Sequence, residues 1–328
     1  MMSKLKILWL GTYSDQVKEM IRELAPEGVD LLFNESKTDV QEHLRLIAQA
    51  EYLAPNGIPV TDEYIKAAKK LKLIQTWSAG VDAYNQDLLR ERNIALQNGV
   101  GFNAPAVAEM VILHVLALNR HYRYVENCLR SGKWVKAEMR DKCNSIYGKT
   151  VGLIGFGNIG RKVAQFMQGF DVEQVFYYDV RRLPEEEEKR RNIVFMEMDD
   201  IFRQADIVSL HVPLNDATRK LVNRERIAMM KPTSLLINTA RGGLVDEEAL
   251  YEALRDGKLR GAGLDTFDPE PPAADNPLFT LDNVSITSHT GGAVRENIPV
   301  RIRHVFDCIM KFEKGEPIDS KFIIVPRK

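Results

Sequence analysis

A glycine-rich stretch near the middle of the chain has the residue types and spacing that bind a dinucleotide. Gly155, Gly157 and Gly160 form the pattern GxGxxG directly after a short apolar run, 151–154. In such a turn the first glycine permits the tight bend, the second lets the backbone approach a pyrophosphate, and the third lets the next helix pack on the strand. That helix is expected to begin near Asn158, so that its unpaired N–H groups face the phosphates. The stretch therefore predicts a nucleotide-binding βαβ unit.

An acidic residue stands where such a unit contacts the adenosine ribose. A second apolar run, 175–178, ends at Asp179. A carboxylate there accepts hydrogen bonds from the ribose hydroxyls and repels a 2′-phosphate, which favours NAD over NADP. Arg181 and Arg182 follow immediately and oppose that preference. GxGxxG alone can also be a glycine-rich turn without a catalytic role, but the strand before it, the helix after it and this acid favour dinucleotide binding.

Polar residues follow four later strands of the same predicted sheet. They lie at 211–213, 239–243, 265–271 and 288–292. Ligands gather beyond the carboxyl ends of the strands in a doubly wound sheet. An arginine, a carboxylate and a histidine on successive strand ends beside a nicotinamide site are typical of catalytic apparatus. The alternative for each residue alone is a surface salt bridge.

Length and composition set the class of protein. A chain of 328 residues with 45% hydrophobic residues predicts about two soluble globular domains. The formal net charge of −1 gives no electrostatic reason to expect nucleic acid or an anionic membrane as a partner. Cys128, Cys143 and Cys308 have no metal-ligand spacing, and their odd number argues against a disulfide framework. The apolar run near the N-terminus is too short for a signal peptide or a membrane span, so we expect a cytoplasmic protein.

The chain alternates strand-like and helix-like segments on both sides of the glycine motif. Before it, strands are expected at 5–10, 29–33, 52–54 and 73–77, with the turn 55–57 after the third, and helices at 16–24, 40–50 and 61–70. This α/β alternation predicts a small domain with parallel strands and without GxGxxG. One helix is expected from a cap at Asn103 to about Arg130. The run 184–191 is interpreted as a solvated stretch of charge.

Together these motifs resemble those of the D-2-hydroxyacid dehydrogenase family, which includes phosphoglycerate dehydrogenase, glyoxylate and hydroxypyruvate reductases and D-lactate dehydrogenase. The resemblance covers almost the whole chain and rests on 155–160, 210–214, 237–246, 265–271 and 289–292. It implies an α/β fold of two Rossmann-like, doubly wound parallel-sheet domains, with the cofactor domain inserted into the substrate domain. Residues 1–102 and 293–328 would form a flavodoxin-like substrate domain. Residues 103–292 would form the NAD-binding Rossmann domain.

Residue by residue, the resemblance makes His289 the acid/base, Glu270 its orienting carboxylate, and Arg241 the anchor for the substrate's carboxylate and carbonyl oxygen. Physical chemistry agrees with these roles. Reduction of a 2-keto acid needs a proton donor at the oxygen, and an imidazolium favoured by a neighbouring carboxylate is a suitable donor near neutral pH. Arginine matches a carboxylate with two hydrogen bonds and so fixes the position of the keto carbon.

The resemblance also implies contacts to the cofactor and the substrate. Thr239 and Asp265 match positions that hold the nicotinamide carboxamide, whereas the loop 79–81, which by itself is an ordinary βα turn, matches the loop for the substrate carboxylate. The expected cofactor contacts are Gly155, Gly157, Asn158, Ile159, Gly160, Asp179, Val212, Pro213, Thr218, Thr239, Ala240, Arg241, Asp265, His289, Gly291 and Gly292. The expected substrate contacts are Ser78, Ala79, Gly80, Val81, Arg241 and His289. No metal is expected.

The expected function is thus NAD-dependent oxidation and reduction of a small 2-hydroxy or 2-keto acid by a homodimer. The stretch 53–57 carries no arginine where relatives that handle phosphate are expected to carry a basic group, which disfavours a phosphorylated substrate. Formate dehydrogenases of the family lack the carboxylate partner of the histidine, so Glu270 argues against that activity. The alternative is an NAD-sensitive protein scaffold like the family's corepressors. Turnover on a panel of 2-keto acids would separate these two classes.

Overall fold

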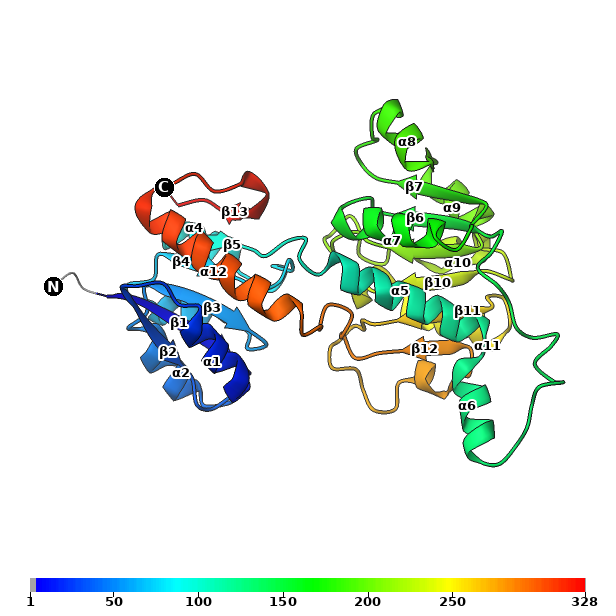
Figure 1. Cartoon of the computed structure of the whole chain (residues 1–328), viewed down its shortest axis with the longest axis horizontal. Helices are drawn as coiled ribbons and strands as arrows, with labels where there is room; N and C mark the ends of the chain where they lie inside the picture. Colours follow the sequence, from blue (N-terminus) through cyan, green and yellow to red (C-terminus); the bar gives the residue numbers. More distant parts are fainter. Residues whose placement is uncertain (1–3, 328) are drawn as a thin grey trace. The chain divides into compact units, whose positions relative to one another are not determined.

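The polypeptide passes from a first unit into a second one and then returns to the first. A computed structural model describes residues 4–327, and within it residues up to 102 and from 294 onward form unit 1, whereas 103–293 form unit 2 (Figure 1). The second unit is therefore an insertion into the first. Each unit is built on its own sheet, flanked by helices.

The sheet of unit 1 has the strand order β13-β5-β4-β3-β1-β2 among the described residues. Without β13 this is the flavodoxin-like order 2-1-3-4-5, in which all strands are parallel. β13 is antiparallel and comes from the far end of the chain. The strands are β1 Leu5–Gly11, β2 Val29–Phe33, β3 Tyr52–Asn56, β4 Leu73–Gln75, β5 Ala95–Gln97 and β13 Ile323–Val325, and the helices are α1 Asp15–Glu23, α2 Val40–Ile47, α3 Asp62–Ala67, α4 Gln86–Glu91 and α12 Asn297–Lys314, with the 3-10 turn η3 Ser320–Phe322.

Alternate side chains of the unit 1 strands face two hydrophobic cores. Ile7 and Trp9 pack on one side with α1 and α12, and Leu8 and Leu10 pack on the other side with α2 and α3. This period of two is what a strand covered on both faces requires. α12 thus covers the same face as α1, and the ring centroids of Phe306 and Trp9 lie 5.3 Å apart. Early and late segments of unit 1 therefore share one core, and the orange helix α12 lies beside the blue helix α1 in Figure 1.

The sheet of unit 2 has the order β12-β11-β10-β9-β6-β7-β8, and all of its described pairings are parallel. The order reverses between β6 and β9, which is where a doubly wound sheet binds its ligand. The strands are β6 Thr150–Ile154, β7 Gln174–Tyr178, β8 Ile193–Phe195, β9 Ile207–Leu210, β10 Leu235–Asn238, β11 Gly261–Leu264 and β12 Val284–Ile286. The helices are α5 Ala104–Asn119, α6 Tyr122–Arg130, α7 Asn158–Gln168, α8 Glu185–Arg191, α9 Met198–Gln204, α10 Arg224–Met229 and α11 Glu247–Arg255, with the 3-10 turns η1 Gly242–Leu244 and η2 Pro277–Thr280.

Unit 2 likewise has a core on each face of its sheet. Leu235 and Ile237 of β10 pack toward α5 and α7, and Leu236 packs toward α9, α10 and α11. α5 and α7 lie side by side on the first face (Figure 1). The predicted fold class of two doubly wound α/β domains is confirmed, because the chain contains two such sheets and its solved neighbours share the arrangement. No helix in the described range 4–327 is both long and apolar enough to cross a bilayer.

The single helix expected from Asn103 to about Arg130 is wrong, because two helices replace it. α5 ends at Asn119, and His121 has the left-handed φ of +47° before α6 begins. A returning segment binds the end of α5: Asn144 donates its N–H to the carbonyl of Asn119 at 2.8 Å. The side chain of Asn103 also makes no capping hydrogen bond.

Two smaller expectations also need correction. The run 184–191 is not a merely solvated stretch, because it forms α8 and Glu188 is only 5% exposed. Glu188 accepts hydrogen bonds from the hydroxyl of Tyr177 at 2.7 Å and from the guanidinium of Arg182. Pro55 belongs to β3 rather than to a turn, since it pairs with Leu10 of β1.

Candidate active site

The glycine motif forms a tight turn between β6 and α7, and the three glycines have different surroundings. Gly155 has a φ of +96°, and a Cβ there would lie 2.6 Å from the carbonyl oxygen of His211. A Cβ on Gly160 would lie 2.3 Å from the carbonyl oxygen of Gly155. A Cβ on Gly157 would meet no described atom within 4 Å. Gly155 and Gly160 are therefore required by packing, whereas Gly157 leaves open space beside the start of α7, which includes Asn158 and Ile159, as a bound pyrophosphate needs.

Asp179 lies at the end of β7, next to this turn. Its Oδ2 accepts a hydrogen bond from the N–H of Phe156 at 2.7 Å, and its Oδ1 accepts one from the N–H of Arg181 at 3.3 Å. The carboxylate is half-buried and holds the middle of the glycine motif in place. Arg182 is turned away to Glu188, with nitrogen–oxygen distances of 2.8 and 2.9 Å. One of the two arginines that follow Asp179 thus already has a carboxylate partner.

The loop after β9 carries three more of the expected cofactor contacts. Thr218 donates its hydroxyl to the carbonyl of Pro213 at 2.7 Å and accepts the N–H of Asn215 at 2.8 Å, so the loop that begins with Val212 closes on itself. His211 lies behind the glycine turn, and burial lowers its pKa to about 3. A neutral imidazole is therefore expected there.

Arg241 follows β10 on a loop that a buried amide closes. Asn238 is 1% exposed; it accepts the N–H of Ala240 at 3.1 Å and donates to the carbonyl of Arg241 at 2.8 Å. A Cβ on Gly242 would lie 1.9 Å from the carbonyl carbon of Phe267, so this loop presses against the one that follows β11. The hydroxyl of Thr239 is buried and has no hydrogen-bond partner within residues 4–327. Because buried polar groups are normally hydrogen-bonded, this hydroxyl is a candidate contact for a polar ligand.

His289 and Glu270 form a hydrogen-bonded pair. Nδ1 of His289 lies 2.7 Å from Oε2 of Glu270, and Oε1 of Glu270 accepts the N–H of Phe267 at 3.1 Å. Because a carboxylate only accepts, Nδ1 carries a proton and Nε2 is the nitrogen that can exchange a proton with a ligand. The side chains of His289 and Glu270 are 47% and 37% exposed, so a ligand can reach them.

Asp265 holds the loop from which His289 projects. The residue is 1% exposed. Its carbonyl accepts the N–H of His289 at 2.7 Å, and its carboxylate accepts the N–H groups of Thr290 at 2.9 Å and Gly291 at 2.8 Å. The hydroxyl of Thr287 donates to the same carboxylate at 2.5 Å.

The loop expected to bind the substrate carboxylate belongs to unit 1. The carbonyl of Ser78 accepts hydrogen bonds from the hydroxyl of Thr76 at 2.6 Å and from the N–H of Gly99 at 3.0 Å. The carbonyl of Ala79 accepts one from the side chain of Asn98 at 3.0 Å. The loop is therefore anchored by its carbonyl groups, while Gly80 and Val81 remain partly exposed.

The structure thus brings Arg241, Glu270, His289 and most expected cofactor residues onto the strand ends of unit 2, and it places residues 78–81 in unit 1. Sequence reasoning missed Asn238, Thr287 and His114. Asn238 bonds to the loop that carries Arg241, Thr287 bonds to Asp265, and His114 bonds to Thr287. Asn238 could have been predicted as a loop-closing residue, because it is a polar residue at a strand end directly before Thr239. No local signal marks His114, because its hydrogen-bond partners lie more than 170 residues away.

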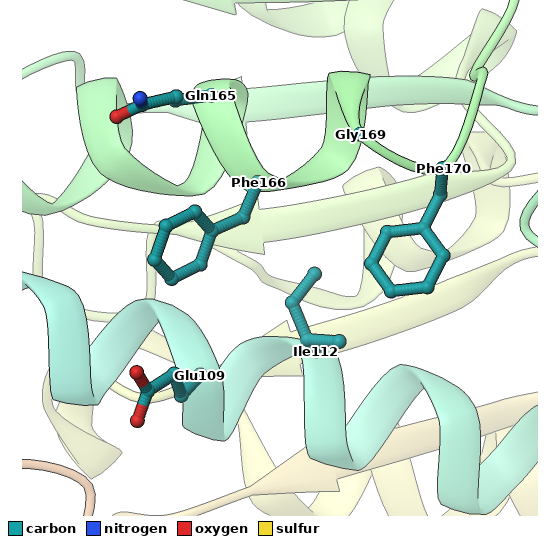
Figure 2. Close-up of a pocket in the computed structure, with 6 residues that line it drawn as sticks. All are labelled: Glu109, Ile112, Gln165, Phe166, Gly169 and Phe170. Atoms are coloured by element: carbon teal, nitrogen blue, oxygen red, sulfur yellow. The ribbon is translucent and has the colours of Figure 1, made fainter.

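A separate surface pocket of about 440 Å³ lies between α5 and α7 in unit 2 (Figure 2). Phe166 of α7 and Phe170, just beyond it, point toward Ile112 of α5, and Glu109 and Gln165 lie at the edge. None of the predicted site residues lines this pocket. It is a mostly apolar surface feature with different chemistry from the candidate active site.

Comparison with known proteins shows the family to which the chain belongs. The family model described as D-isomer specific 2-hydroxyacid dehydrogenase, NAD binding domain, matches residues 112–291. A hydroxypyruvate reductase of Thermotoga maritima is 38% identical over 283 residues, which are 83% of this chain and 90% of that protein. A glyoxylate reductase of Korarchaeum cryptofilum is 33% identical over 260 residues, which are 79% of this chain and 78% of that one.

A solved structure is similar to this chain over its full length. The 2-hydroxyacid dehydrogenase of Ketogulonicigenium vulgare has a TM-score of 0.84 and 28% identity, with full coverage of both chains. The resemblance inferred from the motifs is therefore confirmed. The chain belongs to the D-isomer-specific 2-hydroxyacid dehydrogenase family and is a nicotinamide-dependent oxidoreductase that acts on CH–OH groups.

Proposed function

We propose that the protein is an NAD-dependent dehydrogenase of small, unphosphorylated D-2-hydroxy acids, or equally a reductase of the matching 2-keto acids. The observation that carries this proposal is the hydrogen bond between Nδ1 of His289 and Oε2 of Glu270 at 2.7 Å. It leaves Nε2 as a proton donor or acceptor on an exposed imidazole. Such a pair is what a carbonyl reduction needs, and turnover on a panel of 2-keto acids separates this function from the scaffold alternative.

The residues of this chain would act as follows. A bound nicotinamide supplies the hydride for reduction and accepts it for oxidation. The imidazolium of His289 donates its Nε2 proton to the carbonyl oxygen in reduction, and the neutral ring takes that proton back in oxidation. Glu270 accepts a hydrogen bond from Nδ1–H in both directions, which fixes the orientation of the ring and stabilises its charged form.

Arg241 is proposed as the anchor for the substrate. A guanidinium binds a carboxylate with two parallel hydrogen bonds, so the neighbouring carbonyl carbon is held in one orientation. The loop Ser78 to Val81 is proposed to add backbone N–H groups to the same carboxylate. Its carbonyls are held by Thr76, Asn98 and Gly99, which supports this role because the loop is fixed without the use of those amides.

NAD is proposed over NADP as the cofactor. Asp179 would accept the ribose hydroxyls and repel a 2′-phosphate. One of the two arginines that oppose this preference, Arg182, is engaged by Glu188. Thr239 and Asp265 are proposed to face the nicotinamide carboxamide, and the unpaired hydroxyl of Thr239 supports that assignment.

The proposed substrates are 2-keto acids of two or three carbons, such as glyoxylate or hydroxypyruvate, and the matching hydroxy acids. The relatives named above act on these two compounds according to their names. Reduction of glyoxylate, hydroxypyruvate, pyruvate, larger 2-keto acids and phosphohydroxypyruvate should be measured with NADH and with NADPH. Oxidation of formate should be measured with NAD and with NADP. Highest kcat/KM on a small unphosphorylated 2-keto acid with NADH is expected. Absence of turnover on every acid would favour the scaffold alternative instead.

We further propose that the protein is a cytoplasmic homodimer. Large apolar side chains are exposed along α5, α6 and the following segment, including Leu113 at 52%, Leu129 at 59% and Trp134 at 78%. The pocket between α5 and α7 is lined on α5 by Ile112, which precedes Leu113 in the chain. Exposed apolar surface of this extent is typical of a protein–protein interface. Sedimentation equilibrium at micromolar concentration tests the dimer, and cell fractionation tests the location.

A further inference from the structure

A buried histidine on α5 is hydrogen-bonded through both ring nitrogens, and no step of the proposed reaction uses it. His114 is fully buried. Its Nδ1 lies 2.9 Å from the hydroxyl of Ser285, and its Nε2 lies 3.2 Å from the hydroxyl of Thr287. Burial lowers the pKa of His114 to about 4, although Asp265 opposes this effect. The imidazole is therefore neutral near pH 7 and carries a single N–H.

The contacts of Thr287 decide which ring nitrogen carries that proton. The hydroxyl of Thr287 lies 2.5 Å from Oδ1 of Asp265, and a carboxylate only accepts, so Thr287 donates its one proton there. Toward His114 the hydroxyl can then only accept, which places the N–H on Nε2. Nδ1 is left to accept the proton of Ser285. The four side chains thus form one directed chain of hydrogen bonds that ends on the carboxylate of Asp265.

Asp265 in turn fixes three consecutive backbone amides, those of His289, Thr290 and Gly291. His289 has a φ of +54°, in the left-handed region that non-glycine residues rarely adopt. Such a conformation persists only where its surroundings determine it. Here the determining contacts are the amide hydrogen bonds to Asp265, so the orientation of Asp265 sets the point from which the imidazole of His289 projects.

We propose that His114 is a positioning residue for the proposed reaction, which acts through Thr287 and Asp265 on the loop that carries His289. This inference rests on the function proposed above. Without His114, the hydroxyl of Thr287 loses the donor that holds its oxygen in place, and the carboxylate of Asp265 loses a fixed neighbour. The loop then samples orientations in which the Nε2 proton no longer reaches the carbonyl oxygen.

β11 packs closely against α5 at His114. A Cβ on Gly263 of β11 would lie 2.5 Å from the Cβ of His114, so glycine is required at this position. The neighbours of His114 on its own helix, Val111 and Val115, are fully buried and apolar. A leucine of similar size would therefore be accepted by the packing, and His114→Leu removes the hydrogen bonds with little change in volume.

Three variants and a control separate positioning from packing. His114→Leu breaks the chain at the ring, and Thr287→Val breaks it at the hydroxyl next to Asp265. His114→Gln keeps an N–H donor where Nε2 now stands. The control is His43→Leu, because His43 is also buried, at 1% exposed, and bonded through both nitrogens, to Tyr64 and Ser36, but has no link to this network.

Two readouts are needed. The first is kcat for reduction of the best 2-keto acid, with NADH affinity from fluorescence. The second is hydrogen–deuterium exchange of the peptide that contains Thr290 and Gly291, which requires no catalysis. His114→Leu should lower kcat about tenfold, the scale of a small misplacement of a reacting group, and speed exchange at these amides. NADH affinity should fall less than kcat, because Asp265 is also a proposed cofactor contact. His114→Gln should recover most of both, and His43→Leu should change neither.

The double variant His114→Leu with Thr287→Val gives the sharpest result. Because both changes break one chain, the double variant should be no slower than the worse single variant, whereas independent effects would multiply. Multiplied losses, or wild-type kcat and exchange in His114→Leu, would overturn the inference. If the wild type turned over no 2-keto acid, the proposed function would fail, and the exchange measurement would still decide whether His114 fixes the loop.

Discussion

At the scale of single residues, the central feature is the unusual backbone of His289. Its left-handed φ of +54° is held by the carbonyl of Asp265, and its Nδ1 is held by Glu270 at 2.7 Å. Backbone and ring are therefore both fixed before any ligand binds. This preorganisation matters because a proton donor contributes to a reaction only when it lies within hydrogen-bond reach of the accepting atom.

The choice between the two cofactors is a prediction for one residue, Asp179. Asp179→Asn removes the charge but keeps an acceptor for the N–H of Phe156, whereas Asp179→Ala removes both. Loss of a hydrogen bond to a charged group weakens binding roughly ten- to a hundredfold. Both variants should lower the ratio of kcat/KM with NADH to that with NADPH by this factor, and the asparagine variant should keep the stability of the wild type. A wild type that prefers NADPH would show that Arg181 and Arg182 dominate.

Most residues of the candidate site could be named from the sequence because they follow short motifs with fixed spacing. The glycines, Asp179 and Arg241 are of this kind. Their supports could not be named, because each depends on a distant partner. Arg182 lies beside Asp179 in the chain, but its guanidinium binds Glu188, and only the fold of α8 brings these two residues together.

At the scale of elements, α5 shows where a local pattern fails. The apolar residues from Val111 to Leu118 are interrupted only by His114, so the sequence predicts one long helix. Where the helix ends, a returning segment binds two carbonyl groups: Asn144 binds that of Asn119, and Cys143 binds that of Arg120. A contact between residues more than 20 positions apart in the sequence thus overrides helix propensity, and the residues near Asn119 do not predict it.

α5 also makes a prediction about acid stability. The pKa of His114 is lowered from 6.5 to about 4, mainly by burial, so between these values the unfolded chain binds a proton that the folded chain does not. The free energy of unfolding should therefore fall as the pH drops from about 6.5 to 4, with a contribution from His114 of about 3 kcal/mol at the acid end.

Urea unfolding of the wild type and His114→Leu at pH 7, 6 and 5 measures this contribution. The wild type should lose stability more steeply than the variant over this range. Equal slopes in the two proteins would mean that the pKa of His114 is not lowered in the folded state. The protonated ring would then donate from Nδ1 to Ser285 as well as from Nε2 to Thr287.

At the scale of the whole molecule, the chain builds unit 1 from both of its ends. β13 pairs with β5, and α12 covers the same face as α1, although the inserted unit separates them in sequence. The β13 segment is only three residues long, too short for its pattern to predict a strand or its partner. The α/β class could be predicted from alternation along the chain, but the antiparallel strand at the edge could not.

The division of the chain into two units gives a prediction for the loop of unit 1. Gly80 is proposed to present its backbone to the substrate carboxylate, so the branched side chain of Gly80→Val should block that approach. KM for the 2-keto acid should rise about tenfold or more, the scale of a lost hydrogen bond to a charged group, with NADH affinity almost unchanged. An unchanged KM would return this loop to the role of an ordinary turn.

The central claim is that His289 transfers the proton of a nicotinamide-dependent reduction. Single-turnover reduction of the preferred 2-keto acid by NADH, followed by the loss of NADH absorbance in a stopped-flow instrument, tests it most directly. His289→Ala should slow this step by about two to four orders of magnitude and leave NADH affinity intact, and Glu270→Gln, which keeps the imidazole, should lose less. A single-turnover rate for His289→Ala near that of the wild type would contradict the account.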